Sequence, residues 1–359
     1  MVGPDPEGFG GMSTVVQLFL THTSGNRDVV LRHVVTHQDG SVARRVRVFG
    51  VGAARVLSLL AARRVDVLHL HVSERGSLVR KGMLLRASSA LGVPVVLHCH
   101  GAELAHELAS MGPRTSSVVR SVFSRAALVA VLGAGMVDTV VGAGADPGRV
   151  RVVPNPVALP CAVPQRPTGA QVAVVFLGRL AQRKGATDLV HAVAEMDIAV
   201  RERLRVRMFG DGPVEEVRRL VDELGVGTSV AVRGWLGPDE RDAQLARAEI
   251  FVLPSYDEGL PMALLEAMAW GVVPLVTPVG GIPAVVTDHL NGLLITPGDT
   301  AALGAALAEL VTDAGLRSRL AVAARETAAG HDVRGYVREW VASWDGLSAG
   351  GSPLRGRTG

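Results

Sequence analysis

The stretch Ser255-Tyr-Asp-Glu-Gly-Leu-Pro-Met-Ala-Leu-Leu-Glu-Ala-Met-Ala-Trp-Gly271 follows the run Glu249-Ile-Phe-Val-Leu-Pro254, and together they decide the expected fold. The apolar run favours a strand that is buried on both faces, as strands of parallel sheets are. The side chains of Ser255, Asp257 and Glu258 can cap a helix, and Pro261 suits the first helical position. Apolar residues then recur at helical spacing until Gly271, which is typical of a helix end.

A glycine turn between this strand and this helix predicts an anion site, most naturally for phosphate. The backbone N–H groups and the positive end of the helix dipole would face a ligand near Gly259. Glu266 is a carboxylate among alanine, leucine and methionine residues. A solvent-facing position on an ordinary helix explains Glu266 as well as a functional role does, so this stretch alone leaves both open.

The spacing of Glu258 and Glu266, with Gly-Leu-Pro directly after the first glutamate, resembles the signature of retaining glycosyltransferases of family 4. The resemblance implies an α/β fold with two Rossmann-like domains, called GT-B, that face each other across a cleft. It implies that Glu258 lies near the donor sugar and that Glu266 accepts hydrogen bonds from the nucleotide ribose. The backbone N–H groups of Gly259 and Leu260 would then meet the diphosphate.

A second match to this family begins where the strand-like run at 171–177 ends in Gly-Arg-Leu, followed by Lys-Gly. The family clamps the donor diphosphate with an arginine and a lysine, and these roles fall on Arg179 and Lys184. A planar guanidinium suits bidentate phosphate contact, and a compact ammonium supplies a point charge. Random surface placement is the alternative for Lys184. Trp235, in the family's base-contacting loop, is either part of a platform for the base or a packing residue.

The opening residues 1–16 predict a very short strand, a glycine loop and a helix from about Ser13. Gly10 and Gly11 resemble the family's glycine pair, which approaches the donor phosphates and the acceptor, where a Cβ would block close backbone contact. The first strand is shorter than in the family, which indicates either a start further upstream or a short sheet edge. The loop lacks the G-x-G-x-x-G spacing of a dinucleotide site.

Four histidines lie on two strand-like runs, at 65–72 and 93–101, that are separated by a basic helix. His69 and His71 share one strand face, as do His98 and His100. Zinc is one interpretation, but no carboxylate or cysteine completes a usual motif, so we predict no metal site. The family resemblance instead makes His100 the acceptor-side histidine, which contacts donor sugar or acceptor hydroxyls. His98 is then expected to be a packed or polar-network histidine.

The composition describes a globular chain, because 48% of its 359 residues are hydrophobic and 20% are charged. Two cysteines imply no disulfide framework and fit a reducing compartment, and neither a signal peptide nor a membrane span is apparent. Residues 1–160 carry 17 Lys/Arg against 10 Asp/Glu, a net charge of +7, whereas the remainder has 20 against 24. This excess predicts an anionic partner, either an acidic acceptor or a membrane surface, unless arginine-rich composition alone produced it. We expect a cytoplasmic protein. The basic amphipathic segment 75–86 favours a helix that is solvated on one face and packed on the other, and the alternative is peripheral contact with anionic lipid headgroups at the inner face of the membrane.

The expected organisation has four parts. Residues 1–160 form an acceptor-binding Rossmann-like domain, and residues 161–330 form a nucleotide-sugar-binding Rossmann-like domain. Residues 331–347 form a helix that crosses back to the first domain, and residues 348–359 form a disordered tail rich in glycine, serine and arginine.

The expected function is transfer of a sugar from a nucleotide diphosphate-sugar to a hydroxyl acceptor, with retention of anomeric configuration. The acceptor would be a glycan, a lipid-linked molecule or a small molecule, as in polysaccharide biosynthesis, and no nucleic acid partner is implied. We predict no cofactor and no metal requirement, because the cationic side chains can stabilise the leaving diphosphate and the chain has no Asp-x-Asp motif. The alternatives are a non-catalytic nucleotide-sugar-binding subunit, or an epimerase or phosphorylase on the same fold.

Overall fold

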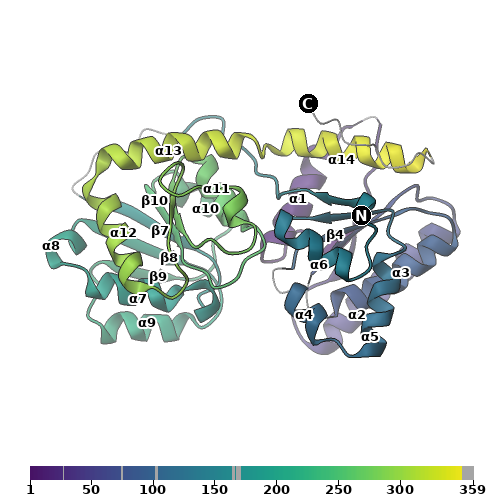
Figure 1. The fold of residues 1–359 in the computed structure, drawn as a ribbon, viewed down its shortest axis with the longest axis horizontal. Coiled ribbons are helices and arrows are strands. Elements are labelled where there is room, and N and C mark those ends of the chain that lie inside the picture. The colour runs from purple at the N-terminus through teal and green to yellow at the C-terminus, as the bar shows by residue number, and fades with distance from the viewer. Residues whose placement is uncertain (27, 74–75, 102–103, 164–165, 167–170, 350–359) are drawn as a thin grey trace. The chain divides into compact units, whose positions relative to one another are not determined.

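A computed structural model describes residues 1–26, 28–73, 76–101, 104–163, 166 and 171–349. The chain divides into two compact units (Figure 1). Unit 1 comprises Met1–Pro156 and Val333–Gly359, and unit 2 comprises Val157–Asp332. The segment predicted to be a disordered tail lies, from residue 350, outside the described residues.

Unit 1 is built on a six-stranded parallel sheet with the strand order β2-β1-β3-β4-β5-β6. The strands are β1 Val2–Pro4, β2 Val34–His37, β3 Leu68–Val72, β4 Val95–Cys99, β5 Leu128–Val131 and β6 Val150–Val152. The helices are α1 Gly11–Thr23, α2 Val42–Ala61, α3 Ser77–Ala90, α4 Leu104–Ser110, α5 Pro113–Phe123, α6 Val137–Gly142 and α14 Val333–Ser348. The short first strand is not a sheet edge, because β1 lies between β2 and β3.

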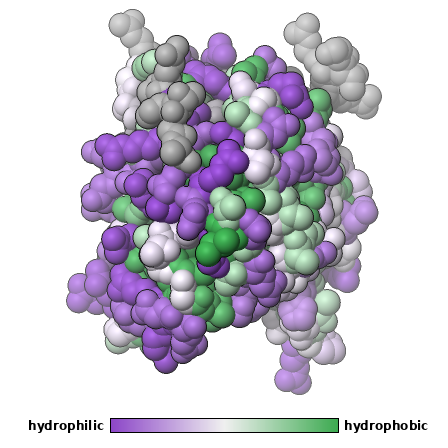
Figure 2. All heavy atoms as spheres, turned by 90° about the vertical axis from the view of Figure 1, so that its left-hand side faces the viewer, coloured by the Kyte–Doolittle hydropathy of each residue, from purple (hydrophilic) through white to green (hydrophobic). Residues whose placement is uncertain are grey.

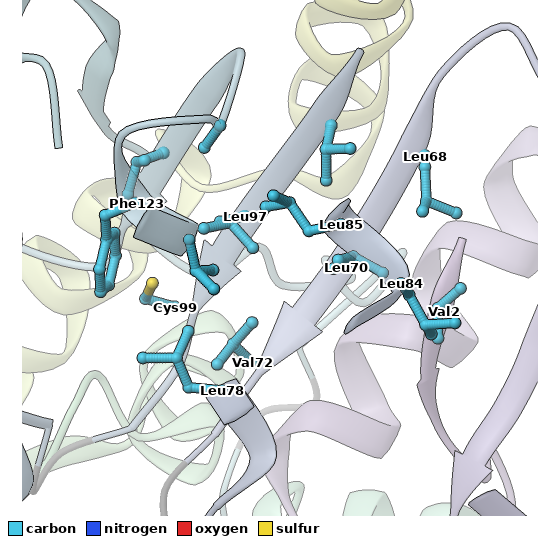
Figure 3. Close-up of a cluster of buried hydrophobic side chains, with 14 of the residues drawn as sticks. Val2, Leu68, Leu70, Val72, Leu78, Leu84, Leu85, Leu97, Cys99 and Phe123 are labelled. Atoms are coloured by element: carbon cyan, nitrogen blue, oxygen red, sulfur yellow. The ribbon is translucent and has the colours of Figure 1, made fainter. Parts of the chain in front are cut away.

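The core of unit 1 encloses both histidine-bearing strands, β3 and β4. Every residue of both strands is buried, and Leu70 and Leu97 pack with Leu84 of α3 and Phe123 of α5 (Figure 3). A Cβ at Gly82 would lie 2.6 Å from a methyl group of Val122, so glycine permits the close approach of α3 and α5.

The basic helix expected between the two histidine strands is present as α3, but one of its charges lies inside. Lys81 is 5% exposed, and its ammonium donates to the carbonyl oxygen of His71. The expectation of a fully solvated or lipid-facing basic face is therefore wrong at Lys81. Arg75, which belongs to the same predicted segment, lies outside the described residues.

Unit 2 repeats the architecture with a second six-stranded parallel sheet, in the order β12-β11-β10-β7-β8-β9. The strands are β7 Val172–Leu177, β8 Leu204–Phe209, β9 Val230–Arg233, β10 Ile250–Leu253, β11 Val273–Val276 and β12 Leu293–Leu294. The helices are α7 Ala186–Glu195, α8 Ile198–Arg201, α9 Val214–Glu223, α10 Pro238–Leu245, α11 Met262–Ala269, α12 Thr300–Thr312 and α13 Ala314–Ala329. Hydrophilic residues cover most of the face of the molecule shown in Figure 2, with smaller hydrophobic areas between them.

The prediction of two Rossmann-like α/β units is confirmed by these two parallel sheets with their helices. The local prediction around α11 is wrong in its details. Pro261 is the N-cap rather than the first helical residue, and no side chain caps the helix. The hydroxyl of Ser255 donates instead to Oε1 of Glu258, at 2.8 Å, so both side chains are engaged with each other.

The parallel arrangement has one functional consequence within each unit. All strands of a parallel sheet end at the same edge, and the loops at this carboxyl edge form the ligand sites of such folds. Among the described residues, no helix has both the length and the hydropathy needed to cross a bilayer.

Candidate functional site

The carboxyl edge of the sheet in unit 2 holds a close ion pair between two predicted site residues. Nζ of Lys184, after β7, lies 2.5 Å from Oε1 of Glu258, after β10. The side chain of Lys184 is 17% exposed and that of Glu258 is 6% exposed, so the pair is largely shielded from solvent. Ser255 donates to the same carboxylate oxygen. The two loops are therefore joined by a charge-assisted contact that positions both side chains.

The loop after β11 contacts the backbone of residues 255–259, the turn that carries Glu258 and Gly259. Gly280 has a φ of +56°, and a Cβ there would lie 1.7 Å from the carbonyl oxygen of Glu258. The N–H of Gly281 donates to the carbonyl oxygen of Gly259 at 2.5 Å. Thr277 donates its hydroxyl hydrogen to the carbonyl oxygen of Ser255 at 2.6 Å. Only glycine fits at position 280, so the turn at Glu258 and Gly259 depends on it.

Arg179 lies in the same loop as Lys184, between β7 and α7. Its Nη1 lies 2.8 Å from Oδ2 of Asp211, which follows β8, and both side chains are partly exposed. A Cβ at Gly210 would lie 1.8 Å from the carbonyl oxygen of Gly178, so the two loops touch through backbone. The structure thus brings Arg179, Lys184 and the Glu258 turn to one edge of one sheet. Asp211 is not among the residues predicted for the site, because its pair with Arg179 joins two turns that lie far apart in the sequence.

Glu266 on α11 is buried, so the solvent-facing alternative for this residue is wrong. It is 8% exposed, and its Oε1 lies 2.8 Å from Nη1 of Arg241 on α10. The pKa of Glu266 is raised above its ordinary value, because the effect of burial exceeds the opposing effect of the Arg241 guanidinium. Arg241 could not be singled out from sequence, because the segment 238–245 is charged on several faces, as solvated helices are.

Two other predicted residues flank this arrangement. Leu260 is 3% exposed and belongs to the turn before α11, so its side chain serves the core. Trp235 follows β9 at the same sheet edge and is 43% exposed, which leaves much of its indole surface open to a ligand. A base-stacking role for Trp235 stays a prediction.

In unit 1, the predicted residues also lie at the carboxyl edge of the sheet. Gly10, after β1, is the N-cap of α1 with a φ of +103°, a conformation that favours glycine, and Gly11 is the first helical residue. His100, after β4, has its Nε2 2.9 Å from Nδ1 of His71 on β3. Burial, with a smaller effect of Lys81, lowers the pKa of His100 to about 3. A neutral His100 can donate one hydrogen bond and accept another.

The other three histidines of β3 and β4, His69, His71 and His98, form a buried network, as predicted for His98. His98 is completely buried, and its Nδ1 lies 3.2 Å from Nε2 of His69. One ring nitrogen from each of His69, His71 and His98 lies within 4.8 Å of the others, a spacing at which a metal ion could be held. The group contains neither a carboxylate nor a cysteine among the described residues. The absence of a metal site stays a prediction.

Two regions of the chain match known protein families. Residues 165–327 match the family described as glycosyl transferases group 1. Residues 14–156 match the glycosyl transferase 4-like domain.

Among curated proteins, the D-inositol 3-phosphate glycosyltransferase of Salinispora arenicola is 30% identical over 313 residues, which are 78% of this chain and 68% of that protein. A GDP-mannose-dependent α-(1-6)-phosphatidylinositol monomannoside mannosyltransferase of Mycobacterium tuberculosis is 29% identical over 340 residues, or 90% of this chain and 77% of that protein. The D-inositol 3-phosphate glycosyltransferase of Corynebacterium efficiens is 34% identical over 184 residues. That match covers 49% of this chain and spans only 41% of the Corynebacterium protein.

Solved structures share the fold at low sequence identity. Anabaena HepE, crystallised with UDP, superposes with a TM-score of 0.73 at 18% identity, over 94% of this chain and 98% of its own. Sucrose-phosphate synthase from Thermosynechococcus elongatus gives a TM-score of 0.77 at 18% identity, over 97% of this chain and 98% of its own. The architecture of the two units is that of these proteins.

Proposed function

Because the chain belongs to the group 1 glycosyltransferase family, we propose that it transfers a sugar from a nucleotide diphosphate-sugar to a hydroxyl group of an acceptor. The contact between Lys184 and Glu258 carries this proposal. It places a cation and a carboxylate beside the turn at Gly259, at the edge of a parallel sheet where nucleotides bind in such folds.

The chemical demand of this reaction is stabilisation of a leaving nucleoside diphosphate. Negative charge grows on the phosphate oxygens as the glycosidic bond breaks, and preformed cations lower that barrier most effectively. Lys184 supplies a shielded charge, and Arg179 supplies an exposed guanidinium that can turn from Asp211 to the phosphates. Glu266 would accept hydrogen bonds from the ribose hydroxyls.

Two finer points belong to the same proposal. The transfer is proposed to retain the anomeric configuration, with the diphosphate leaving and the acceptor hydroxyl attacking on the same face of the sugar, as the resemblance to retaining glycosyltransferases of family 4 implies. Arg179 and Lys184 take the charge that a divalent cation would otherwise neutralise, so the reaction continues in chelator. Proton NMR of the product, which reports the anomeric coupling constant, and assays in EDTA test these points separately.

Binding and turnover together distinguish a transferase from a binding subunit. We would titrate the protein with UDP, GDP and ADP by calorimetry, and then measure release of nucleoside diphosphate from the corresponding sugars. The account expects one nucleotide to bind and its sugar to release diphosphate slowly without acceptor and faster with one. Binding without release under every acceptor condition would support the non-catalytic alternative. Conversion of one nucleotide sugar to another would support the epimerase alternative.

The acceptor is proposed to be a hydroxyl compound at a membrane surface in the cytoplasm. The names of two relatives make inositol phosphates and phosphatidylinositol glycosides the first acceptors to test. The support in this chain is α2, whose exposed side includes four arginines and several large apolar residues. These are Arg44, Arg45, Arg47 and Arg55, with Val42, Val46, Val51 and Leu57. Such a face suits anionic headgroups through both charge and apolar contact.

Co-sedimentation with vesicles tests this membrane contact. Vesicles that contain 30% phosphatidylglycerol should retain the protein at low salt, and pure phosphatidylcholine vesicles should not. Replacing Arg44, Arg45 and Arg47 by glutamine should abolish retention. The same change at three arginines of unit 2, Arg203, Arg207 and Arg219, removes equal charge and should leave retention intact. Equal loss in both variants would mean that net charge, rather than α2, attracts the vesicles.

A further inference from the structure

We propose that Trp344 sets the direction of a buried hydrogen-bond chain through four histidines, in which His71 positions His100 and leaves Nδ1–H of His100 as the donor toward substrate. The chain lies entirely within unit 1 and runs from α14 through β3 and β4 to His100, at the carboxyl edge of the same sheet. The role toward substrate rests on the proposed function, whereas the hydrogen-bond order does not.

The donor and acceptor order from Trp344 through His69 to His98 follows from the chemistry of the indole. Nε1 of Trp344 lies 3.2 Å from Nδ1 of His69, and an indole N–H can only donate. Nδ1 of His69 therefore carries a lone pair, and the proton of the neutral ring is on Nε2. That Nε2 lies 3.2 Å from Nδ1 of His98, so His69 donates and His98 accepts. The proton of His98 is then on its Nε2.

Burial keeps these rings neutral. His69, His71 and His98 are at most 2% exposed, and burial lowers the pKa of each well below its ordinary value. A neutral histidine has one donor nitrogen and one acceptor nitrogen, so fixing one nitrogen fixes the other.

The second half follows from two nitrogens that have no partner among the described residues. Nε2 of His98 and Nε2 of His71 are both buried and unpaired, and the two ring centres lie 5.2 Å apart. Two buried donors side by side would each carry a desolvation cost, whereas one donor and one acceptor can pair after a small ring rotation or through one water. His71 then accepts at Nε2 and donates from Nδ1 to Nε2 of His100, 2.9 Å away.

The same indole contact argues against a metal ion at these histidines. A metal on Nε2 of His69 would need a lone pair there, yet the hydrogen bond from Trp344 already occupies the lone pair on Nδ1. A neutral imidazole has only one lone pair available in its ring plane. Metal ligation at Nε2 and the contact with Trp344 therefore exclude each other.

Nitrogen-15 NMR of the imidazole groups tests the order without substrate. The proposal expects Nε2–H in His69 and His98, and Nδ1–H in His71 and His100. Trp344→Phe keeps the aromatic packing and removes the donor, so His100 should become a mixture of tautomers. Trp340→Phe is the matched control, because Trp340 packs against His69 while its indole nitrogen donates no hydrogen bond to any of the four histidines. This control should leave all four tautomers unchanged.

Several results would overturn the proposal. Nδ1–H in His69 of the unaltered protein contradicts the first step, and Nε2–H in His100 contradicts the last. An unchanged His100 in Trp344→Phe shows that the chain does not control it. Stoichiometric zinc, found by elemental analysis or by simultaneous shifts of the three buried rings on titration with zinc sulfate, replaces the hydrogen-bond chain by a metal site.

Kinetics test the role of His71 as a positioning residue. His71→Asn keeps an amide donor near the position of Nδ1 and should retain kcat within about threefold, whereas His71→Ala should lose on the order of 100-fold, with KM for the donor little changed. Trp344→Phe should lower kcat by about tenfold, and Trp340→Phe should not. A folded His71→Ala variant with normal kcat contradicts the role. If no nucleotide sugar is turned over, the proposed function fails, and the NMR result still decides the hydrogen-bond order.

Discussion

The ammonium of Lys184 lies 2.5 Å from a carboxylate oxygen of Glu258 at the edge of the sheet in unit 2. A diphosphate that enters the site would compete with Glu258 for this cation. Ser255 also donates to the carboxylate, so Glu258 keeps a hydrogen-bond partner if the lysine turns to phosphate. In the proposed function, the pair is a cation site whose charge is balanced before the donor arrives.

Removing either cation should slow transfer more than it weakens donor binding. Lys184→Ala and Arg179→Ala each remove charge that stabilises the leaving group, and we expect kcat to fall by roughly 100-fold or more. Glu266→Ala should mainly raise the donor Kd, because its proposed contact with ribose is made before and during transfer. Steady-state kinetics and calorimetry measure these effects, with Arg219→Ala on α9 as the control. Near-normal rates for both cation variants would refute the site assignment.

Gly280→Ala should disable the site without an added or lost charge. The new methyl group would meet the carbonyl oxygen of Glu258, and the positive φ would add strain of about 1 kcal/mol or more. We expect loss of nucleotide binding by calorimetry in a protein that still folds. Gly227→Ala is the control, because a Cβ there makes only ordinary contact with Val221. Unchanged binding in Gly280→Ala would show that the turn tolerates displacement.

The pair formed by Arg241 and Glu266 should contribute to the stability of unit 2. Arg241→Met leaves a buried carboxylate without its cation, and we expect a loss of about 1–3 kcal/mol in the free energy of unfolding at pH 7.5. Arg218→Met removes an exposed pair with Glu215 and a 3.3 Å hydrogen bond from Nε to the carbonyl oxygen of Val232, and should cost less than about 1 kcal/mol. Urea unfolding measures both free energies. Equal losses in the two variants would mean that the burial of Glu266 does not increase the contribution of its ion pair to stability.

Unit 1 should lose stability as pH falls below about 6.5, the ordinary pKa of an unfolded histidine. Burial lowers the pKa of His100 to about 3. It also lowers the pKa values of His69, His71 and His98 well below the ordinary value. Between the folded and unfolded pKa values, the unfolded chain binds more protons, so stability falls with pH. Each extra proton contributes about 1.4 kcal/mol per pH unit.

Urea unfolding between pH 7.5 and pH 5, followed through the fluorescence of Trp340 and Trp344 with Trp235 and Trp270 replaced by phenylalanine, measures this slope. His98→Leu should reduce the slope by about one proton. His106→Leu, at an exposed position of the same unit, is the matched control. A slope that does not depend on His98 would contradict the linkage.

The two sheets could be predicted because central strands such as β7 and β10 are apolar on both faces and end in glycine or polar turns. The candidate residues near Glu258 could be found because their chemistry is local in sequence. Arg241 and Asp211 could not, since each becomes informative only when folding brings it to a residue far along the chain. Lys81 was misplaced for a related reason. Helical periodicity does not predict that the ammonium of Lys81 is buried and donates to the backbone carbonyl of His71 on β3.

The most direct test of the central claim is mass spectrometry of an acceptor incubated with the protein and a panel of nucleotide sugars. The account predicts that one donor adds the mass of a single sugar to an inositol-bearing or glycan acceptor, and that Lys184→Ala loses this product. If no donor yields a glycosylated acceptor, or if Lys184→Ala forms the product at the normal rate, then the account is wrong.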